Sequence, residues 1–479
     1  MSAIDEVREW LEEFKKDGSI RTDFPPHAGE ECYNPVECAP RERIEELRDK
    51  HLRHIVKWAY EKSEFYHKMW DKTGVRPQDI RTYDDLEKLP VWRKDQQRKD
   101  ELENPFFGSR VVKELIPHVP ALYRSTGTTG KPTLHPWIPE DTEAIEESRA
   151  RWVWSGGGRT GGAFVDFAPA AKGSLIKIMT GVARRVGLLH YHEEIFGYQA
   201  DPAASAAFQL ELGEFYRPLC TFMAPEFLIT LGEQFKRMGK ENPYDAVLPG
   251  GTPLSSRLRQ ELRSLYKKPR GFPNITGAYE SGVATECLFS AEKGLDLFHN
   301  SEDLAVFEVV KPGTGQRVAF GERGELVTTN FFNHIAPFIR FGMEDVFENS
   351  FTTEPCPYCG RTLKTWLKPI PGRLKDIFNV KGKELMPWDV EVIIGDIPDT
   401  TLIYQLILDS WDMERLELKV ETVRRLPDPQ YQREIKSTLE NRLEIPVDVE
   451  VISAGTIPMA PGGYKVIKVV DRRPKKTSL

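Results

Sequence analysis

The chain has 479 residues, a net charge of -7 and a pI near 5.9. Hydrophobic residues make up 40% and charged residues 29%, as is typical of a globular protein with more than one domain. The negative charge argues against non-specific nucleic-acid binding and favours a small-molecule partner. No stretch reaches the roughly 18 apolar residues of a membrane span, and the residues up to Leu11 are too charged for a secretory signal. We therefore expect a cytoplasmic protein that binds neither nucleic acid nor membrane.

The expected elements divide the chain into three segments. Residues 1–41 begin with an amphipathic helix and continue into a stretch rich in Pro and Cys, which we treat as an N-terminal extension. Residues 42–372 alternate short apolar runs with helical periodicity, which predicts a large layered α/β domain. Residues 373–479 have the length of a small domain and are expected to form an α+β unit.

Within the large segment, apolar residues at three- and four-residue steps predict a helix over 42–70. A short capped helix over 82–90 ends at a proline, and acidic residues just after Pro139 favour the first turn of a helix there. The other elements expected are strands over 163–167, 246–251, 325–329, 401–408, 416–420 and 447–452, and helices over 255–266 and 430–443.

The most informative stretch is Tyr123–Thr133, which reads Tyr-Arg-Ser-Thr-Gly-Thr-Thr-Gly-Lys-Pro-Thr. Hydroxyl side chains and glycine N–H groups bind phosphate oxygens, and the lysine adds a positive charge. The Walker A pattern needs a longer spacer before its Gly-Lys pair, so this is a different kind of phosphate loop. Taken alone, the same residues also suit a polar surface turn.

Four further stretches follow the loop: Thr276–Glu280, Pro337–Val346, Gly372–Asp376 and Gly462–Asp471. In this order and spacing, the loop and these stretches resemble the adenylate-forming enzymes, which include acyl-CoA synthetases, luciferase-like ligases and peptide-synthetase adenylation domains. Within that superfamily the chain most resembles the phenylacetate–CoA ligase branch, from about residue 42 to about residue 474. The resemblance implies a large adenylation domain followed by a small mobile domain.

The resemblance also implies roles for individual residues. The residues that match the loop holding the ATP phosphates are Ser125, Thr126, Gly127, Thr128, Thr129, Gly130 and Lys131. The residues that match the segments around the nucleotide base are Gly251, Thr252, Pro253, Thr276, Gly277 and Tyr279.

The remaining residues that match the family are charged. Glu280 matches the acid that binds Mg²⁺, a cation that neutralises charge as pyrophosphate leaves. Asp345 matches the acid that holds the ribose hydroxyls, Arg373 the arginine that assists it, and Lys375 the hinge. Lys465 matches the lysine that bridges the substrate carboxylate and the α-phosphate. We expect direct catalytic roles for Lys465, Glu280, Thr126 and Lys131.

Cysteines in a long cytosolic chain are thiols or metal ligands rather than a disulfide framework. Cys32 and Cys38 are spaced more widely than a usual zinc pair, so we interpret them as structural or surface thiols. Cys356 and Cys359 form a Cys-x-x-Cys turn followed by glycine, which is typical of a zinc half-site. A redox pair and an inert turn are the alternatives.

Some members of the resembled branch carry a structural zinc at this place, with ligands from the segment after the Mg²⁺-binding acid. The resemblance therefore implies Cys287 as a third ligand. The fourth is His299 or Asp296, and the two alternatives stay open at this point.

The resemblance implies an ATP- and Mg²⁺-dependent enzyme that converts an aromatic (aryl or arylacetic) acid to an acyl-adenylate. It then transfers the acyl group to coenzyme A, releasing AMP and pyrophosphate, and the branch suggests a homodimer. Aromatic candidates for an apolar acid pocket are Phe164, Phe167, Phe222 and Tyr279.

Two alternatives remain. One is an adenylate-forming enzyme with another acceptor, as in the synthetases that adenylylate a deazaflavin coenzyme. The other is a nucleotide-binding relative that has lost catalysis, which is favoured by Thr276 in place of the usual tyrosine and Tyr464 in place of the usual glycine.

Overall fold

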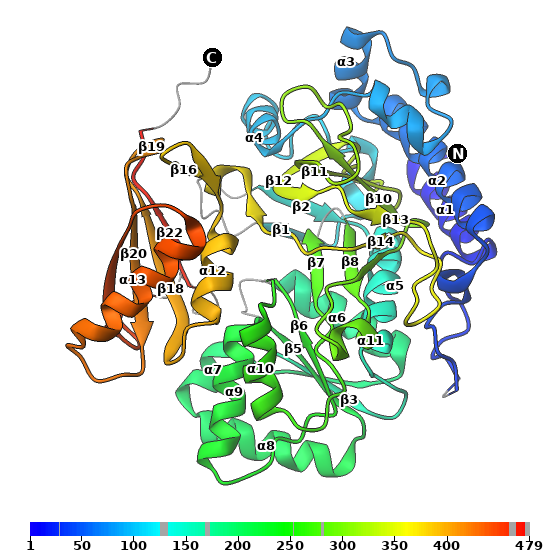
Figure 1. Cartoon of the computed structure of the whole chain (residues 1–479). Helices are drawn as coiled ribbons and strands as arrows, with labels where there is room; N and C mark the ends of the chain where they lie inside the picture. Colours follow the sequence, from blue (N-terminus) through cyan, green and yellow to red (C-terminus); the bar gives the residue numbers. More distant parts are fainter. Residues whose placement is uncertain are drawn as a thin grey trace.

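The computed structural model describes residues 1–27, 29–124, 133–167, 173–251, 253–278, 282–458 and 466–474. Figure 1 shows a large body, coloured blue to yellow, with a smaller orange and red body beside it. Within the described residues, the two bodies consist of six sheets and the helices around them. Within the described part of the chain, no helix combines the length and apolar composition needed to cross a membrane.

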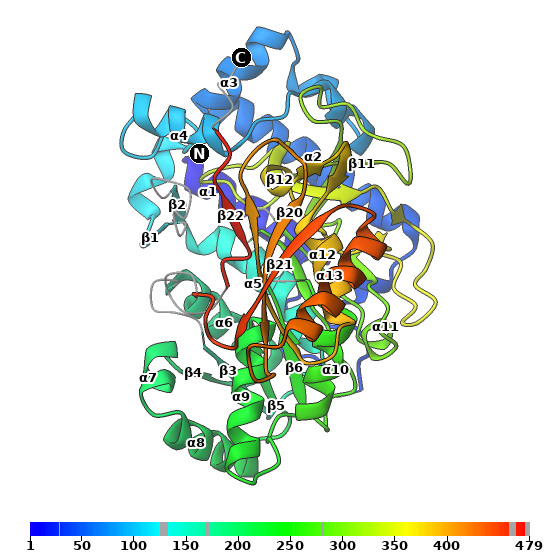
Figure 2. The same cartoon turned by 60° about the vertical axis from the view of Figure 1, so that its left-hand side comes forward.

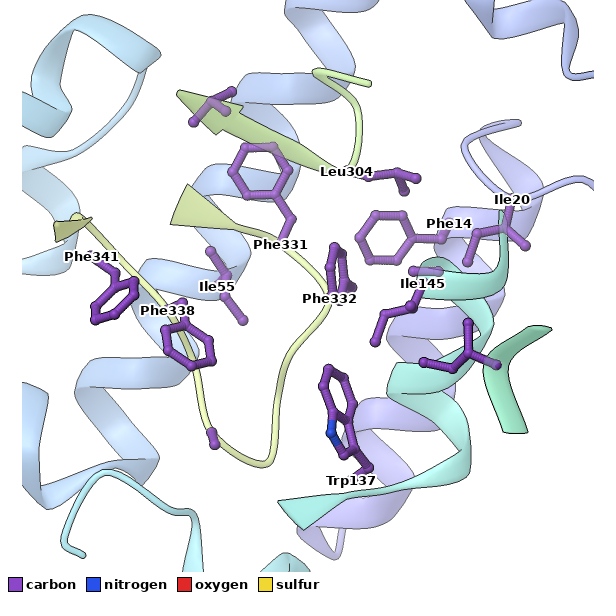
Figure 3. Packing of buried hydrophobic residues seen from close by; sticks show 14 of the residues in the cluster. Phe14, Ile20, Ile55, Trp137, Ile145, Leu304, Phe331, Phe332, Phe338 and Phe341 are labelled. Atoms are coloured by element: carbon purple, nitrogen blue, oxygen red, sulfur yellow. The ribbon is translucent and has the colours of Figure 1, made fainter. Parts of the chain in front are cut away.

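The N-terminal helices are part of the large body, and the first three lie along its right-hand side in Figure 1. They are α1 (Ala3–Lys16), α2 (Arg41–Lys62), α3 (Glu64–Thr73) and α4 (Lys94–Glu103). Ser2 caps α1, because its Oγ accepts a hydrogen bond from the N–H of Asp5. The apolar face of α1 belongs to the main hydrophobic core, and Figure 3 shows Phe14 beside Phe332 and Ile145 of that core. The boundary near residue 41 stays a prediction.

A parallel sheet forms the lower half of the large body in Figure 1. Its strands are β3 (Ala163–Asp166), β4 (Leu189–His192), β5 (Leu219–Met223) and β6 (Ala246–Pro249), in the order β4-β3-β5-β6. Helices α5 (Pro139–Ser155) and α6 (Gly173–Val186) share a core with one face. Helices α7 (Ile195–Ala200), α8 (Pro202–Phe215), α9 (Pro225–Arg237) and α10 (Ser256–Leu265) share a second core with the other face.

Helix α5 runs through the interior and is buried almost all round, including its charged residues. Arg151 pairs with Asp303 at 2.8 Å and with Glu147 at 3.1 Å. Glu147 also accepts hydrogen bonds from the N–H of Arg21 and the side chain of Asn34. These paired charges avoid the cost of an isolated buried ion and attach the N-terminal segment to the core.

Antiparallel sheets form the upper half of the large body. One has the order β10-β11-β12-β15, with strands Ala305–Val310, Arg323–Asn330, Phe341–Glu348 and Gly372–Arg373. The other has the order β13-β14-β9-β8-β7, with strands Phe351–Thr352, Thr365–Trp366, Phe298–Asn300, Gly282–Glu286 and Ile275–Ala278. Helix α11 (Leu288–Glu292) follows β8, and a hairpin of β1 (Ala121–Arg124) and β2 (Leu134–Trp137) lies beside the sheets. In the core beneath these sheets, Figure 3 shows Phe331 and Phe338 beside Ile55, with Phe341 next to Phe338.

The small body has its own hydrophobic core, which runs from Phe378 to Val449 with Val469 packed against it. Its main sheet has the order β21-β20-β18-β22, with strands Val447–Ser453, Leu416–Thr422, Thr400–Leu408 and Val469–Asp471. A second small sheet contains β16 (Phe378–Val380), β17 (Lys383–Leu385) and β19 (Asp412–Met413). Helices α12 (Pro387–Gly395) and α13 (Pro429–Leu443) cover one face of the main sheet (Figure 2).

The sequence-based elements agree closely with these bounds. The expected helices over 255–266 and 430–443 and the strand over 401–408 are confirmed to within a residue or two. The long helix expected over 42–70 is interrupted at Ser63, so that α2 and α3 are separate helices.

Candidate functional site

Asp345 and Arg373 lie opposite each other where the large body ends. They are register partners in strands β12 and β15, and Arg373 Nε lies 3.3 Å from Asp345 Oδ1. The pairing of β11 with β12 shifts register here, and Glu344 has a φ of 61° in the left-handed region. Such a bulge re-aims the side chain that follows it. Burial raises the pKa of Asp345 to about 6, while the Arg373 charge opposes that rise.

Lys375 lies just beyond this pair, in a short turn over Leu374–Asp376. Arg473 from the last described segment donates hydrogen bonds to the carbonyls of Lys375 (2.5 Å) and Ile377 (2.6 Å). Its guanidinium lies 4.2 Å from the centre of the Trp411 ring. Arg373 is therefore bonded to the large body and Lys375 to the small body, so the connection between the bodies is confined to a few residues.

Gly251, Pro253, Thr276 and Gly277 are brought together at the carboxyl edge of the parallel sheet. Gly250 forms a parallel bridge with Ile275, which joins the end of β6 to the start of β7. Gly277 has a φ of 112°, and a Cβ there would lie 2.6 Å from the carbonyl oxygen of Gly282. Only glycine fits that position without rearrangement.

Several predicted site residues lie outside the described residues. They are Ser125, Thr126, Gly127, Thr128, Thr129, Gly130, Lys131, Thr252, Tyr279, Glu280 and Lys465. The structure does describe the two ends of the predicted phosphate loop, where Arg124 and Leu134 are register partners in the β1–β2 hairpin.

Lys468 lies close to Lys465 in the sequence but is held by its own domain. Its Nζ is 2.7 Å from Oε2 of Glu391, and the same oxygen accepts a hydrogen bond from the Tyr404 hydroxyl at 3.1 Å. The ion pair with Glu391 raises the pKa of Lys468 despite its burial. This lysine is therefore paired in the conformation described.

Three cysteines and a histidine converge at the predicted metal centre. The ligand atoms of Cys287, His299, Cys356 and Cys359 all lie within 4.8 Å of one another. Nε2 of His299 is 3.2 Å from Cys359 Sγ, and its Nδ1 is 3.0 Å from the Thr365 hydroxyl, which orients the ring.

The other candidate for the fourth position, Asp296, is paired elsewhere, with Arg259 at 2.7 Å. Hydrogen bonds from the thiols of Cys287 and Cys359 hold the pKa of Cys356 far below its usual value. Three cysteine sulfurs and one imidazole in a largely buried tetrad are a donor set that fits structural zinc.

The candidate aromatic residues do not share one environment. Phe164 joins the core under α5 and α6, whereas Phe167 packs on Tyr198 and Phe227 in the core on the opposite face of the sheet. Phe222 contacts Trp152 at a centroid distance of 5.1 Å and is partly buried at the carboxyl edge of β5. Of the three, Phe222 is best placed to contact a ligand at that edge.

Sequence reasoning missed a polar cluster at the ends of β3 and β4. Asp166 is fully buried and contacts two imidazoles, His190 through Nε2 at 2.5 Å and His192 through Nδ1 at 2.8 Å. The Thr180 hydroxyl contacts the other nitrogen of His190 at 2.9 Å. The signal was present as a His-x-His pair in a short apolar strand, since alternate residues of a strand share a face.

Comparisons with known proteins identify what the chain is similar to. Residues 382–473 match the family described as the AMP-binding enzyme C-terminal domain. A phenylacetate–coenzyme A ligase from Thermus thermophilus is 28% identical over 403 residues, covering 81% of this chain and 84% of that protein. The Escherichia coli phenylacetate–coenzyme A ligase is 26% identical over 456 residues, covering 92% and 97%. The chain is therefore similar to phenylacetate–coenzyme A ligases over most of its length. The expected resemblance to adenylate-forming enzymes and the expected fold class are confirmed.

Solved structures of adenylate-forming enzymes also indicate how the two bodies are arranged. A 2-hydroxyisobutyryl-CoA ligase in the postadenylation state matches with a TM-score of 0.81 at 19% identity, over 94% of both chains. The same ligase in the thioesterification state matches with a TM-score of 0.65 at 20% identity. The chain therefore superposes better on the postadenylation structure of that ligase than on its thioesterification structure.

Proposed function

We propose that this protein is an ATP-dependent carboxylate–CoA ligase that acts on an aromatic acid. The observation that carries the proposal is the similarity to phenylacetate–CoA ligases over most of the chain, from the N-terminal helices into the small body. The acid would first react with ATP to give an acyl-adenylate and pyrophosphate. The CoA thiol would then attack the adenylate to give the thioester and AMP.

In this proposal no protein nucleophile is needed, because the adenylate already supplies a good leaving group. The chain contributes positioning and charge neutralisation. Asp345, ionised and aimed by the β12 bulge, would accept hydrogen bonds from the ribose hydroxyls, and Arg373 would hold it in place. The loop Ser125–Lys131 would bind the phosphates, and Lys465 would bridge the carboxylate and the α-phosphate.

Two metal ions belong to the same proposal. Mg²⁺ bound by Glu280 would neutralise charge on the phosphates. Zn²⁺ held by Cys287, His299, Cys356 and Cys359 would be structural, since all four positions of a tetrahedral site are then filled by protein. We also propose that the protein is a homodimer and that it is cytoplasmic. Size-exclusion chromatography with light scattering would test the first proposal, and cell fractionation the second.

The decisive experiment is ATP–pyrophosphate exchange with a panel of aromatic acids, followed by thioester formation on adding CoA. We expect acid-dependent exchange and CoA-dependent formation of AMP and thioester. Exchange without consumption of CoA would indicate another acceptor. No exchange with any acid would indicate a nucleotide-binding relative that has lost catalysis.

A further inference from the structure

The order of the parallel sheet identifies where a ligand crevice can form. The chain passes from β3 to β4 on one side and then to β5 on the other side of β3, so the direction reverses between β3 and β5. In open α/β sheets, ligands bind beyond the carboxyl ends of the strands at such a reversal. The residues that end these strands are therefore candidates for contact with a ligand.

Residues at the last or next-to-last position of each strand form one row across the sheet. Asp166 is the register partner of His192 on one side and of Phe222 on the other, and Phe222 is the partner of Leu248. Register partners in neighbouring strands point to the same face. The row thus runs from apolar residues near the Gly250–Ile275 bridge to a polar end at Asp166 and His192.

His192 is the member of this row that can meet a ligand. Its Nδ1 is held by the buried Asp166 carboxylate, and its side chain is 21% exposed, against 9% for His190. Both nitrogens of His190 contact other side chains, whereas Nε2 of His192 has no hydrogen-bond partner among the described residues. The contact with Asp166 also raises the pKa of His192.

We infer that His192, oriented by Asp166, binds a hydroxyl group on the aromatic ring of the acid substrate. The inference rests on the proposed function and names a substrate class within it. The ring would lie toward Phe222, with its carboxylate toward the nucleotide side and its hydroxyl toward His192. His192 lies two strands from Phe222, a separation of about 10 Å at the usual strand spacing.

A hydroxyl group fits this position better than a methyl group or a bare ring. A hydroxyl both donates and accepts hydrogen bonds, so it can pair with Nε2 whether the imidazole is neutral or protonated. An unsubstituted ring would leave Nε2 desolvated and unpaired, which is the usual source of selection for a hydroxylated ligand.

The test compares matched acids with and without a ring hydroxyl, in both catalysis and binding. The probes are phenylacetate and benzoate with their ortho-, meta- and para-hydroxy derivatives, measured by kcat/KM for exchange and by calorimetric Kd. For at least one isomer we expect the hydroxylated acid to be preferred by about 10-fold to 100-fold. His192→Leu should abolish that preference, and His192→Gln, which keeps a polar atom near Nε2, should retain part of it.

Tyr191→Phe is the matched control, because the Tyr191 ring packs against Phe208 on the other face of the sheet. It should leave the preference unchanged, and thermal melting of each variant checks that it folds. Equal kcat/KM and Kd for every matched pair, or a preference that survives His192→Leu, would overturn the inference. A binding preference that depends on His192 in a protein without exchange activity would support the inference and overturn the proposed ligase function.

Discussion

Asp345 is the single residue whose surroundings give the clearest pH dependence. Its folded pKa of about 6 exceeds the value of roughly 3.9 expected for an unfolded aspartate. The folded state therefore holds this proton more tightly than the unfolded state. The stabilisation from this group is fully present below about pH 4 and is lost as the pH rises through about 6.

The proposed ribose contact requires the ionised form of Asp345. We expect the KM for ATP to rise as the pH falls below about 6, because the protonated carboxyl group accepts hydrogen bonds less well. Asp345→Asn should raise the KM and remove this pH dependence. The variant should gain more stability over wild type at pH 7 than at pH 4, because the wild-type protein has lost the stabilisation from protonated Asp345 at pH 7. A wild-type KM that is constant between about pH 5 and 7.5 would exclude Asp345 from nucleotide binding.

We expect Lys465 to act only in the first half-reaction, the formation of the acyl-adenylate. Lys465→Ala should slow adenylate formation by about 10²-fold or more, the scale of one transition-state charge contact. Thioester formation from synthetic acyl-adenylate and CoA should persist. Lys419→Ala is the control, since Lys419 makes only a surface pair with Glu450 and should affect neither step. Equal loss of both half-reactions in Lys465→Ala would contradict its assignment.

At the scale of elements, the predicted metal centre brings together ligands from three separate parts of the chain. Cys356 and Cys359 lie in one turn, Cys287 precedes α11 and His299 is in β9. Arg361, just after the turn, pairs with Glu37 of the N-terminal segment at 2.6 Å. A metal at the tetrad would therefore stabilise packing between elements as well as the turn itself.

Purified protein should contain about one zinc per chain, measured by elemental analysis. Cys356→Ser should lose that zinc and lower the melting temperature, because the free energy of metal binding contributes to folding. Cys38→Ser alters an exposed thiol outside the tetrad and should retain the metal. Zinc-free wild-type protein whose melting temperature is unchanged by a chelator would show that the tetrad has no structural metal.

At the scale of the whole molecule, two bodies with separate cores meet at a short connection. Arg373 is paired within the large body, and Arg473 binds the carbonyls that follow Leu374 to the small body. The fold matches the postadenylation structure of a 2-hydroxyisobutyryl-CoA ligase with a TM-score of 0.81 and its thioesterification structure with a TM-score of 0.65. A rotation at this junction would be absorbed by a few backbone torsions.

Lys375→Pro should restrict that rotation, because proline fixes φ near roughly −65° and restricts the residue before it. We expect ATP–pyrophosphate exchange to persist while CoA thioester formation falls steeply in the same preparation. Lys375→Ala, which leaves the backbone free, should retain both activities. Parallel changes in the two rates, or no change in either, would exclude Lys375 as the pivot.

Much of the fold could be predicted because it depends on local patterns. The strand over 401–408 and the helix over 430–443 follow from apolar periodicity, and the structure confirms both. The interruption at Ser63 was missed because the apolar periodicity continues across it, although the backbone of Ser63 is extended. The order of the phosphate loop and the four stretches after it was sufficient to predict the resemblance to adenylate-forming enzymes, because order along the chain is a property of sequence.

Tertiary structure decided which side chains meet. The sequence left His299 and Asp296 as alternatives for the fourth metal ligand. Only the folded chain brings His299 to the cysteines, while Arg259 pairs with Asp296. The contact of Asp166 with His190 and His192 depends on the register between β3 and β4, which are separated by helix α6. Strand register is set by packing against the rest of the fold, so no local pattern could specify these contacts.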